Sequence, residues 1–173
     1  KSVLNVSWQN PVMAGMATAT LEKELQARMS EQGVIAKVQG DVKTALASAA
    51  KKVEARYLLP YLSHATMEPM NCTASVTAER CEVWVPTQNQ GGVQSLAAKI
   101  TGLKPEQVFV QTTYLGGGFG RRFEQDFVEE AVTISKVAGR PVKLIWTREE
   151  DIQNDFYRPA NYTKIEAGLD EKG

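Results

Sequence analysis

The sequence contains few of the residues that bind metal ions through their own side chains. Its 173 residues include two cysteines, Cys72 and Cys81, and one histidine, His64. No Cys-x-x-Cys motif is present, so we expect no iron–sulfur cluster and no structural zinc site within this chain. A single histidine also excludes the usual zinc-hydrolase motif. Two isolated cysteines are more typical of buried thiols than of a disulfide bond.

The chain also lacks an excess of charge and any long apolar run. Lys plus Arg and Asp plus Glu each number 20, so no overall field attracts nucleic acid or an anionic membrane. Even the longest apolar stretches, such as residues 57–62, are far too short to span a membrane. The first residues show no signal-peptide pattern. Glycine (13) and proline (7) are sparse, and an apolar content of 43% is sufficient for a folded core.

Both ends of the sequence are typical of a fragment of a longer polypeptide. The chain has no initiator methionine and opens within an alternating, strand-like stretch at residues 3–8. It closes with a strand-like run, residues 163–169, that enters a turn at residues 170–173. Asp and Gly in such a turn usually lead into a second strand, which we expect to lie beyond this sequence.

Apolar periodicity and chain breakers predict an α+β domain. Apolar residues at every fourth position predict an amphipathic helix over residues 14–31, and Asp41 is suited to cap a second, short helix. Helices over residues 91–102 and 126–138 are each expected to end at a glycine. The predicted strands are residues 34–38, 53–59, 73–78, 81–85, 108–113 and 142–146, of which 73–78 and 81–85 form a hairpin. Layered mixed sheets with packed helices fit this pattern.

The most unusual segment is Leu-Gly-Gly-Gly-Phe-Gly-Arg-Arg at residues 115–122. Four glycines in five residues allow positive φ and a very close approach of the backbone to another body. Its amides can face an anion, and Arg121 and Arg122 add planar donors for phosphate or carboxylate. The spacing matches neither G-x-G-x-x-G nor the P-loop. An equally good interpretation is a tight backbone crossing in which both arginines form salt bridges within the protein.

Two loops contain further polar candidates. Gln88 follows a predicted strand, and its amide can donate to an oxo or carbonyl oxygen, although a loop capped by Asn89 is the commoner arrangement. The loop at residues 64–72 contains His64 and Glu68, but its mixed ligand types match no common metal geometry. Buried, hydrogen-bonded polar groups are therefore the expected role of these two side chains.

A third candidate segment is residues 146–151, Trp-Thr-Arg-Glu-Glu-Asp, where a predicted strand runs into a helix. Thr147 and Glu150 have the spacing of a capping box, so a helix start is the expected role of this segment. Glu68, Glu149 and Glu150 are candidate acids or bases, and nothing local distinguishes their pKa values.

Taken together and in this order, these segments resemble the large subunit of the molybdenum hydroxylases. The motifs are H-A-x-M-E-P-x-x-C at residues 64–72, T-Q-N at 87–89, G-G-G-F-G at 116–120 and W-T-R-E-E-D at 146–151. The family includes xanthine dehydrogenases, aldehyde oxidoreductases and carbon monoxide dehydrogenases. The two arginines after the last glycine and the form M-E-P-M-N-C are most similar to bacterial isoquinoline 1-oxidoreductase and related aldehyde dehydrogenases. The resemblance runs from residue 50 or so to the end and implies the molybdopterin-binding fold of aldehyde oxidase and xanthine dehydrogenase.

The resemblance implies a molybdenum ion held by the dithiolene of a molybdopterin, often as the cytosine dinucleotide, so that the protein need supply no metal ligand. Gln88 would hydrogen-bond an oxo group on molybdenum, and Phe119 would form a wall of the substrate pocket. The implied cofactor-binding residues are Gln88, Gly117, Gly118, Phe119, Gly120 and Arg121. No motif matches the general-base glutamate of the family. Phe123 stands where some relatives have an acidic residue that helps to place the substrate.

The implied reaction is hydroxylation of an N-heterocycle such as isoquinoline, or oxidation of an aldehyde. Electrons would pass to [2Fe–2S] clusters on a separate small subunit, and the remaining domains of the large subunit would complete the site. Residues 1–50 would connect from a preceding domain, and residues 51–173 would be the first cofactor-binding domain, truncated at its C-terminal end. We expect such a fragment to bind no cofactor and to be inactive alone. Cytoplasm and periplasm both fit the resemblance.

Two alternatives remain open. In the first, the chain is a stand-alone module that holds a nucleotide phosphate at residues 116–122, which nucleotide titration would reveal. In the second, it is an assembly domain of a relative that has lost the cofactor. The presence of both Gln88 and the glycine run makes the second alternative less attractive.

Overall fold

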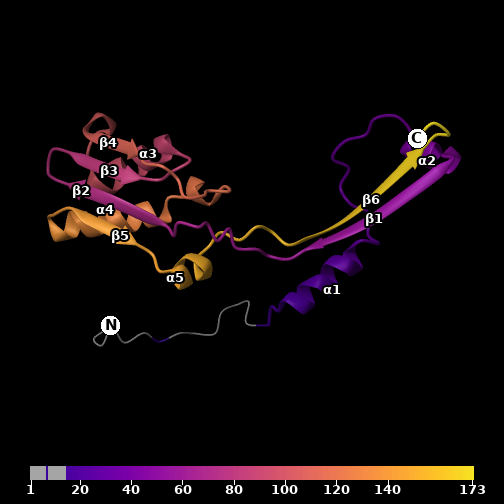
Figure 1. Cartoon of the computed structure of the whole chain (residues 1–173), viewed down its shortest axis with the longest axis horizontal. Helices are drawn as coiled ribbons and strands as arrows, with labels where there is room; N and C mark the ends of the chain where they lie inside the picture. The colour runs from indigo at the N-terminus through magenta and orange to yellow at the C-terminus, as the bar shows by residue number, and fades with distance from the viewer. Residues whose placement is uncertain (1–6, 8–14) are drawn as a thin grey trace. The chain divides into compact units, whose positions relative to one another are not determined.

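The computed structural model describes residue 7 and residues 15–173, which form two compact units (Figure 1). Unit 1 comprises the described residues up to Tyr61 together with Pro159–Gly173, and unit 2 comprises Leu62–Arg158. The strand predicted over residues 3–8 falls outside the described residues, apart from Ser7. None of the helices in the described part of the chain is long and apolar enough to cross a bilayer.

Unit 1 contains two helices and a long two-stranded ribbon. Helix α1 (Thr18–Arg28) is shorter than predicted, and α2 (Val42–Ser48) begins after Asp41, whose carboxylate accepts a hydrogen bond from the Thr44 amide at 3.1 Å. Strands β1 (Lys51–Leu59) and β6 (Asn161–Leu169) pair antiparallel. Both helices and both strands were predicted, and β1 is largely exposed within this chain.

The strand predicted over residues 34–38 is wrong. These residues are irregular, and Val34, Ile35 and Val38 are exposed. A strand is stable only when a neighbouring strand takes up its backbone hydrogen bonds, and among the described residues no such neighbour pairs with this segment. Apolar alternation alone therefore gave a false strand.

Unit 2 is built on a four-stranded mixed sheet with the order β4-β3-β2-β5. The strands are β2 (Asn71–Val76), β3 (Cys81–Val85), β4 (Val108–Thr112) and β5 (Val142–Ile145). The predicted β2–β3 hairpin is confirmed, with Val76 opposite Cys81. Strand β3 pairs parallel with β4, so the chain must cross over between them, and helix α3 (Gln90–Thr101) makes this crossover.

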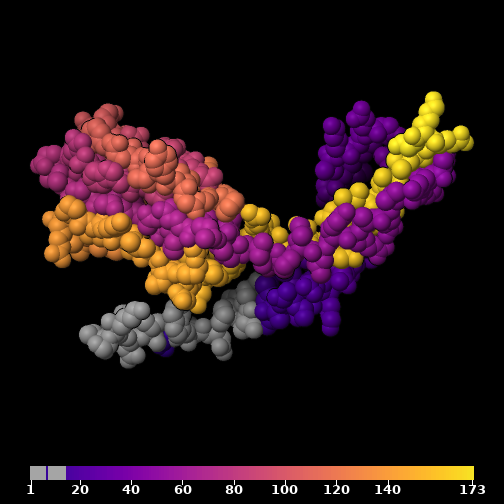
Figure 2. Space-filling view, viewed as in Figure 1, coloured from indigo at the N-terminus to yellow at the C-terminus, as the bar shows by residue number. Residues whose placement is uncertain are grey.

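Helices α3 and α4 (Asp126–Ala138) pack on the same face of the sheet, and unit 2 is closely packed in the space-filling view (Figure 2). Alternate strand residues point into this layer, as the period of two requires. The buried apolar residues are Met70, Cys72, Ala74, Cys81, Val83, Val85, Val93, Ala97, Val108, Phe127, Val128, Ala131, Val132 and Trp146. The predicted α+β class with helices packed on mixed sheets is thus confirmed.

The ends of the helices agree with the sequence signals. Asn89 caps α3 by accepting a hydrogen bond from the Gly92 amide at 2.9 Å. Gly102 and Gly139 end α3 and α4 in the left-handed conformation, with φ of 79° and 61°. Helix α5 (Arg148–Gln153) begins at the predicted capping box of Thr147 and Glu150. These local signals fix where the loops of the candidate site leave the packed layers.

Candidate functional site

Three loops of unit 2 meet around the buried side chain of Arg122. The guanidinium donates to the carbonyl of Gly117 at 2.7 Å, to the carbonyl of Glu68 at 2.7 Å and to the Glu68 carboxylate at 2.8 Å. Its third nitrogen lies 3.5 Å from the carbonyl of Pro86, at the limit of a hydrogen bond. The loop before β2, the loop between β3 and α3, and the glycine run are therefore held by one residue.

The glycine run and the loop before β2 also contact each other directly. The Glu68 amide donates to the carbonyl of Gly116 at 3.0 Å, and the Gly116 amide donates to the Glu68 carboxylate at 3.1 Å. A Cβ on residue 116 would lie 2.4 Å from the Cβ of Glu68. No larger residue fits there without a backbone shift, so the close approach expected of this glycine is a contact within the protein.

Gln88 faces the centre of the glycine run. Its side-chain oxygen accepts a hydrogen bond from the Gly120 amide at 3.1 Å, while its backbone N–H donates to the carbonyl of Arg122 at 3.0 Å. A Cβ on Gly118 would lie 2.7 Å from the same side-chain oxygen. Because the oxygen is held, the NH₂ group of Gln88 points away from Gly120, and none of the described residues accepts a hydrogen bond from it.

Phe119 projects from the run at its most unusual backbone position. Its φ is 53°, a conformation that L residues rarely adopt, and its side chain is 65% exposed. Gly117 and Gly120 on either side also have positive φ, near 100°. Backbone strain of this kind costs on the order of 1–3 kcal/mol and persists only where neighbouring contacts enforce it. Here the enforcing contacts are those of Gln88 and Arg122.

Arg121 is directed into the protein. It is buried, and its guanidinium forms a two-point pair with the Asp126 carboxylate at 2.9 and 2.7 Å. Its Nε lies 3.1 Å from the carboxylate of Asp155 but is not aligned for a hydrogen bond. The rings of Trp146 and Phe156 lie beside the same group, at 5.5 and 5.1 Å. Both arginines therefore form salt bridges within the protein, and neither guanidinium is free to hold a phosphate.

Asp155 connects the loop before β2 to this cluster, and no sequence motif indicated this role. Its carboxylate accepts hydrogen bonds from the Ser63 hydroxyl at 2.7 Å and from the His64 amide, and lies 2.9 Å from His64 Nδ1. Burial raises the pKa of Asp155, but the hydrogen bonds from Ser63 and His64 together outweigh it, so the pKa is lowered. Ser63 and Asp155 are 92 positions apart, and only the tertiary fold brings them together.

The segment at residues 146–151 contacts helix α4 and the loop before β2. The Trp146 ring nitrogen donates to Glu130 at 2.8 Å, and Arg148 donates to the carbonyl of Met67 at 2.9 Å. Arg148 also pairs with the buried Asp151 at 2.6 Å. Burial raises the pKa of Asp151 despite this partner. The contacts made by this segment are therefore structural.

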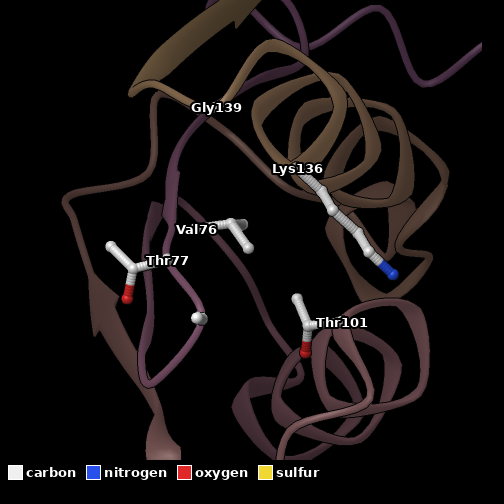
Figure 3. Close-up of a pocket in the computed structure, with 6 residues that line it drawn as sticks. Val76, Thr77, Thr101, Lys136 and Gly139 are labelled. Carbon is white, nitrogen blue, oxygen red and sulfur yellow. The ribbon is translucent and has the colours of Figure 1, made fainter.

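A pocket of about 460 Å³ lies elsewhere in unit 2, and Figure 3 shows Lys136 extending beside Thr101 within it. It is lined by Val76, Thr77, Ala78, Thr101, Lys136 and Gly139. The Lys136 ammonium group already donates to the carbonyl of Ile100 at 2.6 Å. The pocket contains no residue of the four motifs and no carboxylate, so we do not take it as the functional site.

Metal-ligating side chains are not gathered in the described part of the chain. Among residues 7 and 15–173, no group of three or more His, Cys, Asp or Glu residues is placed to hold a metal ion. Cys72 and Cys81 are free, buried thiols of the core. The sequence-predicted site residues Gln88 and Gly117–Arg121 do come together, around Arg122 and Glu68.

Comparisons with known proteins bear on this arrangement. The family model described as the molybdopterin cofactor-binding domain matches residues 24–173. The chain is 37% identical over 109 residues to isoquinoline 1-oxidoreductase subunit beta of Brevundimonas diminuta, covering 62% of this chain and 14% of that protein. It is 31% identical over 135 residues to the aldehyde oxidoreductase molybdenum-binding subunit PaoC of Escherichia coli K12, covering 78% and 18%. The chain thus spans less than a fifth of the length of these relatives.

Solved structures show the same fold. The aldehyde oxidoreductase from Desulfovibrio gigas aligns with a TM-score of 0.64 and 21% identity, over 76% of this chain and 15% of that chain. The quinoline 2-oxidoreductase from Pseudomonas putida 86 aligns with a TM-score of 0.61 and 22% identity, over 75% and 17%.

Proposed function

The chain belongs to the family of molybdopterin cofactor-binding domains, and from this premise we propose that it forms one wall of the cofactor site in a molybdenum-dependent oxidoreductase. The observation that carries the proposal is the contact between Gly118 and Gln88. A side chain at Gly118 would displace the Gln88 amide, so the glycine keeps this amide in place at the surface of the loop. The fixed side-chain oxygen leaves the NH₂ group to donate outward.

The residues at this surface fit a large, oxygen-rich cofactor. The glycine run presents backbone rather than side chains, apart from Phe119, and therefore permits close contact. Gln88 offers a donor rather than a metal ligand, which suits a metal held by a pterin rather than by the protein. We assign cofactor contacts to Gln88, Gly117, Gly118, Phe119, Gly120 and the backbone of Arg121.

Each residue has a distinct part in the proposed mechanism. When bound, the cofactor supplies a redox centre that accepts electrons from the substrate. Gln88 hydrogen-bonds an oxygen of the bound group and fixes its orientation, with its own side chain held by Gly120. The exposed ring of Phe119 forms an apolar wall that orients an aromatic or aldehyde substrate and excludes water from one side. The general base is supplied from outside this chain.

The remaining assignments extend the proposal to the whole protein. We propose as substrate a small N-heterocycle or an aldehyde, since the relatives' names include an isoquinoline oxidoreductase and an aldehyde oxidoreductase. We also propose the cytosine dinucleotide form of the cofactor, [2Fe–2S] clusters on a small partner subunit, and contributions from other domains of the large subunit. In the same scheme, residues 1–50 connect from a preceding domain and residues 51–173 form the first cofactor-binding domain.

The molybdenum content of the polypeptide that contains this chain tests the proposal. It should be purified, with any accompanying subunit, from cells that synthesise the cofactor. We expect about one molybdenum per chain, and a clear loss on Gly118→Ala, because the new methyl group displaces Gln88. Gly91→Ala is the matched control, since a Cβ there meets no atom within 4 Å. A folded wild-type protein without molybdenum would exclude the proposal.

A stand-alone phosphate-binding module is not favoured as an alternative. It relied on Arg121 and Arg122 as donors to a phosphate, and both guanidinium groups are paired inside the protein. The family match over residues 24–173 favours the cofactor wall instead.

A further inference from the structure

His64 lies against the glycine run and is held by a buried carboxylate. Its Nδ1 lies 2.9 Å from one oxygen of Asp155 and 3.2 Å from the other. The side chains of His64 and Asp155 are only 10% and 2% exposed. Ser63 and the backbone amide of His64 donate to the same carboxylate, so the anchor of the ring is itself fixed. The orientation of the imidazole is therefore set on its Nδ1 side.

The other ring nitrogen faces the loop that carries the proposed cofactor contacts. Apart from the residues next to it in the chain, Nε2 is the only atom of the described residues within 4 Å of where a Cβ on Gly120 would lie, at 4.0 Å. None of the described residues hydrogen-bonds Nε2, and the atom keeps some exposure to solvent. A carboxylate only accepts, so the proton of neutral His64 lies on Nδ1 and leaves Nε2 as an acceptor, or as a donor when the ring is protonated.

We propose that His64 is a further ligand-contacting residue of this site, with Nε2 forming a hydrogen bond to a polar oxygen or nitrogen of the group that lies against Gly120. Asp155 is the positioning residue that holds the ring for this purpose. An aspartate that fixes one nitrogen of a histidine and leaves the other facing a ligand is an arrangement suited to directed hydrogen bonding. The inference rests on the proposed function and adds a contact to it.

The competing explanation is purely structural. Asp155 is a buried carboxylate that also pairs with Arg121. In this explanation, the role of His64 is only to donate a hydrogen bond to that carboxylate. That role needs Nδ1 alone, whereas the proposed role needs Nε2. The two nitrogens can be tested separately, because the amide nitrogen of Asn occupies the position of Nδ1 and the side-chain amide of Gln reaches the position of Nε2.

The test compares His64→Gln with His64→Asn in the full polypeptide loaded with its cofactor. Molybdenum loss on extended dialysis is followed beside kcat and KM. If the contact is to the cofactor, we expect His64→Asn to lose molybdenum about tenfold faster while His64→Gln stays near wild type. If the contact is to the substrate, the same order is expected in KM with retention unchanged. Ser63→Ala is the control, since it weakens the anchor but keeps both ring nitrogens.

Several outcomes would overturn the inference. Equal behaviour of the two variants, or a better performance of His64→Asn, assigns His64 a structural role only. If either variant does not fold, Asp155→Ala removes the acceptor that holds Nδ1, and unchanged retention and KM in that variant reject the inference as well. A wild-type protein without molybdenum is a separate failure, because it rejects the proposed function before His64 is tested.

Discussion

The guanidinium of Arg122 and the carboxylate of Glu68 are 2.8 Å apart, although Arg122 is fully buried and Glu68 is 35% exposed. Burial lowers the pKa of Arg122, and the charge of Glu68 opposes this effect. The same guanidinium nitrogen also donates to the Glu68 carbonyl at 2.7 Å. A buried cation is tolerated here because its partner and the surrounding carbonyls replace the lost hydration.

Replacing Arg122 with lysine should therefore destabilise unit 2 strongly. A lysine ammonium is a compact point charge and cannot donate to Gly117, Pro86 and Glu68 at once as the planar fork does. Unpaired buried acceptors cost about 1–3 kcal/mol each, so we expect a loss of about 2–4 kcal/mol. Thermal or urea unfolding measures it.

Arg80→Lys is the control for that experiment. Arg80 pairs with Glu82 at 2.7 Å, but both side chains are solvent-accessible. Exposed pairs contribute about 0–1 kcal/mol, so the control should melt close to wild type. An Arg122→Lys protein with the melting temperature of the control would contradict the account of Arg122 as the residue that joins the loops.

Local signals in the sequence were sufficient for most of the fold. The caps at Asn89 and Thr147 and the stop at Gly139 act within one turn of helix, so they can be read without the tertiary structure. The strand predicted at residues 34–38 was wrong because strand formation depends on a partner strand that can be distant in the sequence, and local alternation does not reveal that partner. The exposure of β1 could not be predicted either, since an alternating pattern does not reveal whether another part of the chain covers the strand.

The site was only partly readable from sequence. The motifs identified Gln88 and the glycine run, because contiguous residues carry these signals. The roles of Arg121 and Arg122 stayed undecided, because the sequence does not distinguish an arginine that binds a ligand from one that pairs with a carboxylate inside the protein. Asp155 was missed entirely, because its hydrogen-bond partners Ser63 and His64 lie 92 and 91 positions away in the sequence. Long-range charge pairing is the part that required the structure.

Cys72 should be inert to thiol reagents in the folded protein. Burial raises its pKa to about 12, and its side chain is fully enclosed in the core. The reactive thiolate is therefore scarce at neutral pH and unreachable without opening of unit 2. We expect labelling by a maleimide to follow the rate of unfolding and to accelerate steeply in urea. Prompt labelling of the folded protein at Cys72 would contradict the packing of β2 against the helices.

Asp155 and Asp151 should affect acid stability with opposite signs. The folded pKa of Asp155 is lowered, so its contribution to stability is present above the unfolded value of 3.8 and is lost as the pH falls through the folded pKa. The folded pKa of Asp151 is raised, so stability declines as the pH rises from 3.8 through that folded pKa. Asp155→Asn should therefore flatten the acid-induced loss of stability.

Asp151→Asn should have the converse effect on the same curve. It removes a group whose ionisation opposes folding, so stability should rise more steeply with pH just above 3.8. Melting temperatures of both variants between about pH 3 and pH 7 provide the measurement. Parallel curves for the two variants would contradict the opposite directions of these two pKa shifts.

Gln88→Glu isolates the donor function of the proposed cofactor contact. The glutamate keeps the shape of the side chain and an oxygen for the Gly120 amide, so the loop should stay in place. It removes the NH₂ donor and adds a negative charge beside the bound group. Loss of one such hydrogen bond is worth about 1.5–3 kcal/mol, which corresponds to a fall in kcat/KM of about 10- to 160-fold.

The comparison variant is Gln111→Glu, the same change at an exposed position of β4. It should leave both the melting temperature and kcat/KM unchanged. Gln88→Glu should match it in melting temperature and differ only in catalysis, because the Gly120 contact survives while the outward donor is lost. Full activity in Gln88→Glu would mean that the NH₂ group donates to nothing in the loaded protein. The only role of Gln88 would then be to accept the hydrogen bond from the Gly120 amide, and its side chain would serve the fold of the glycine run alone.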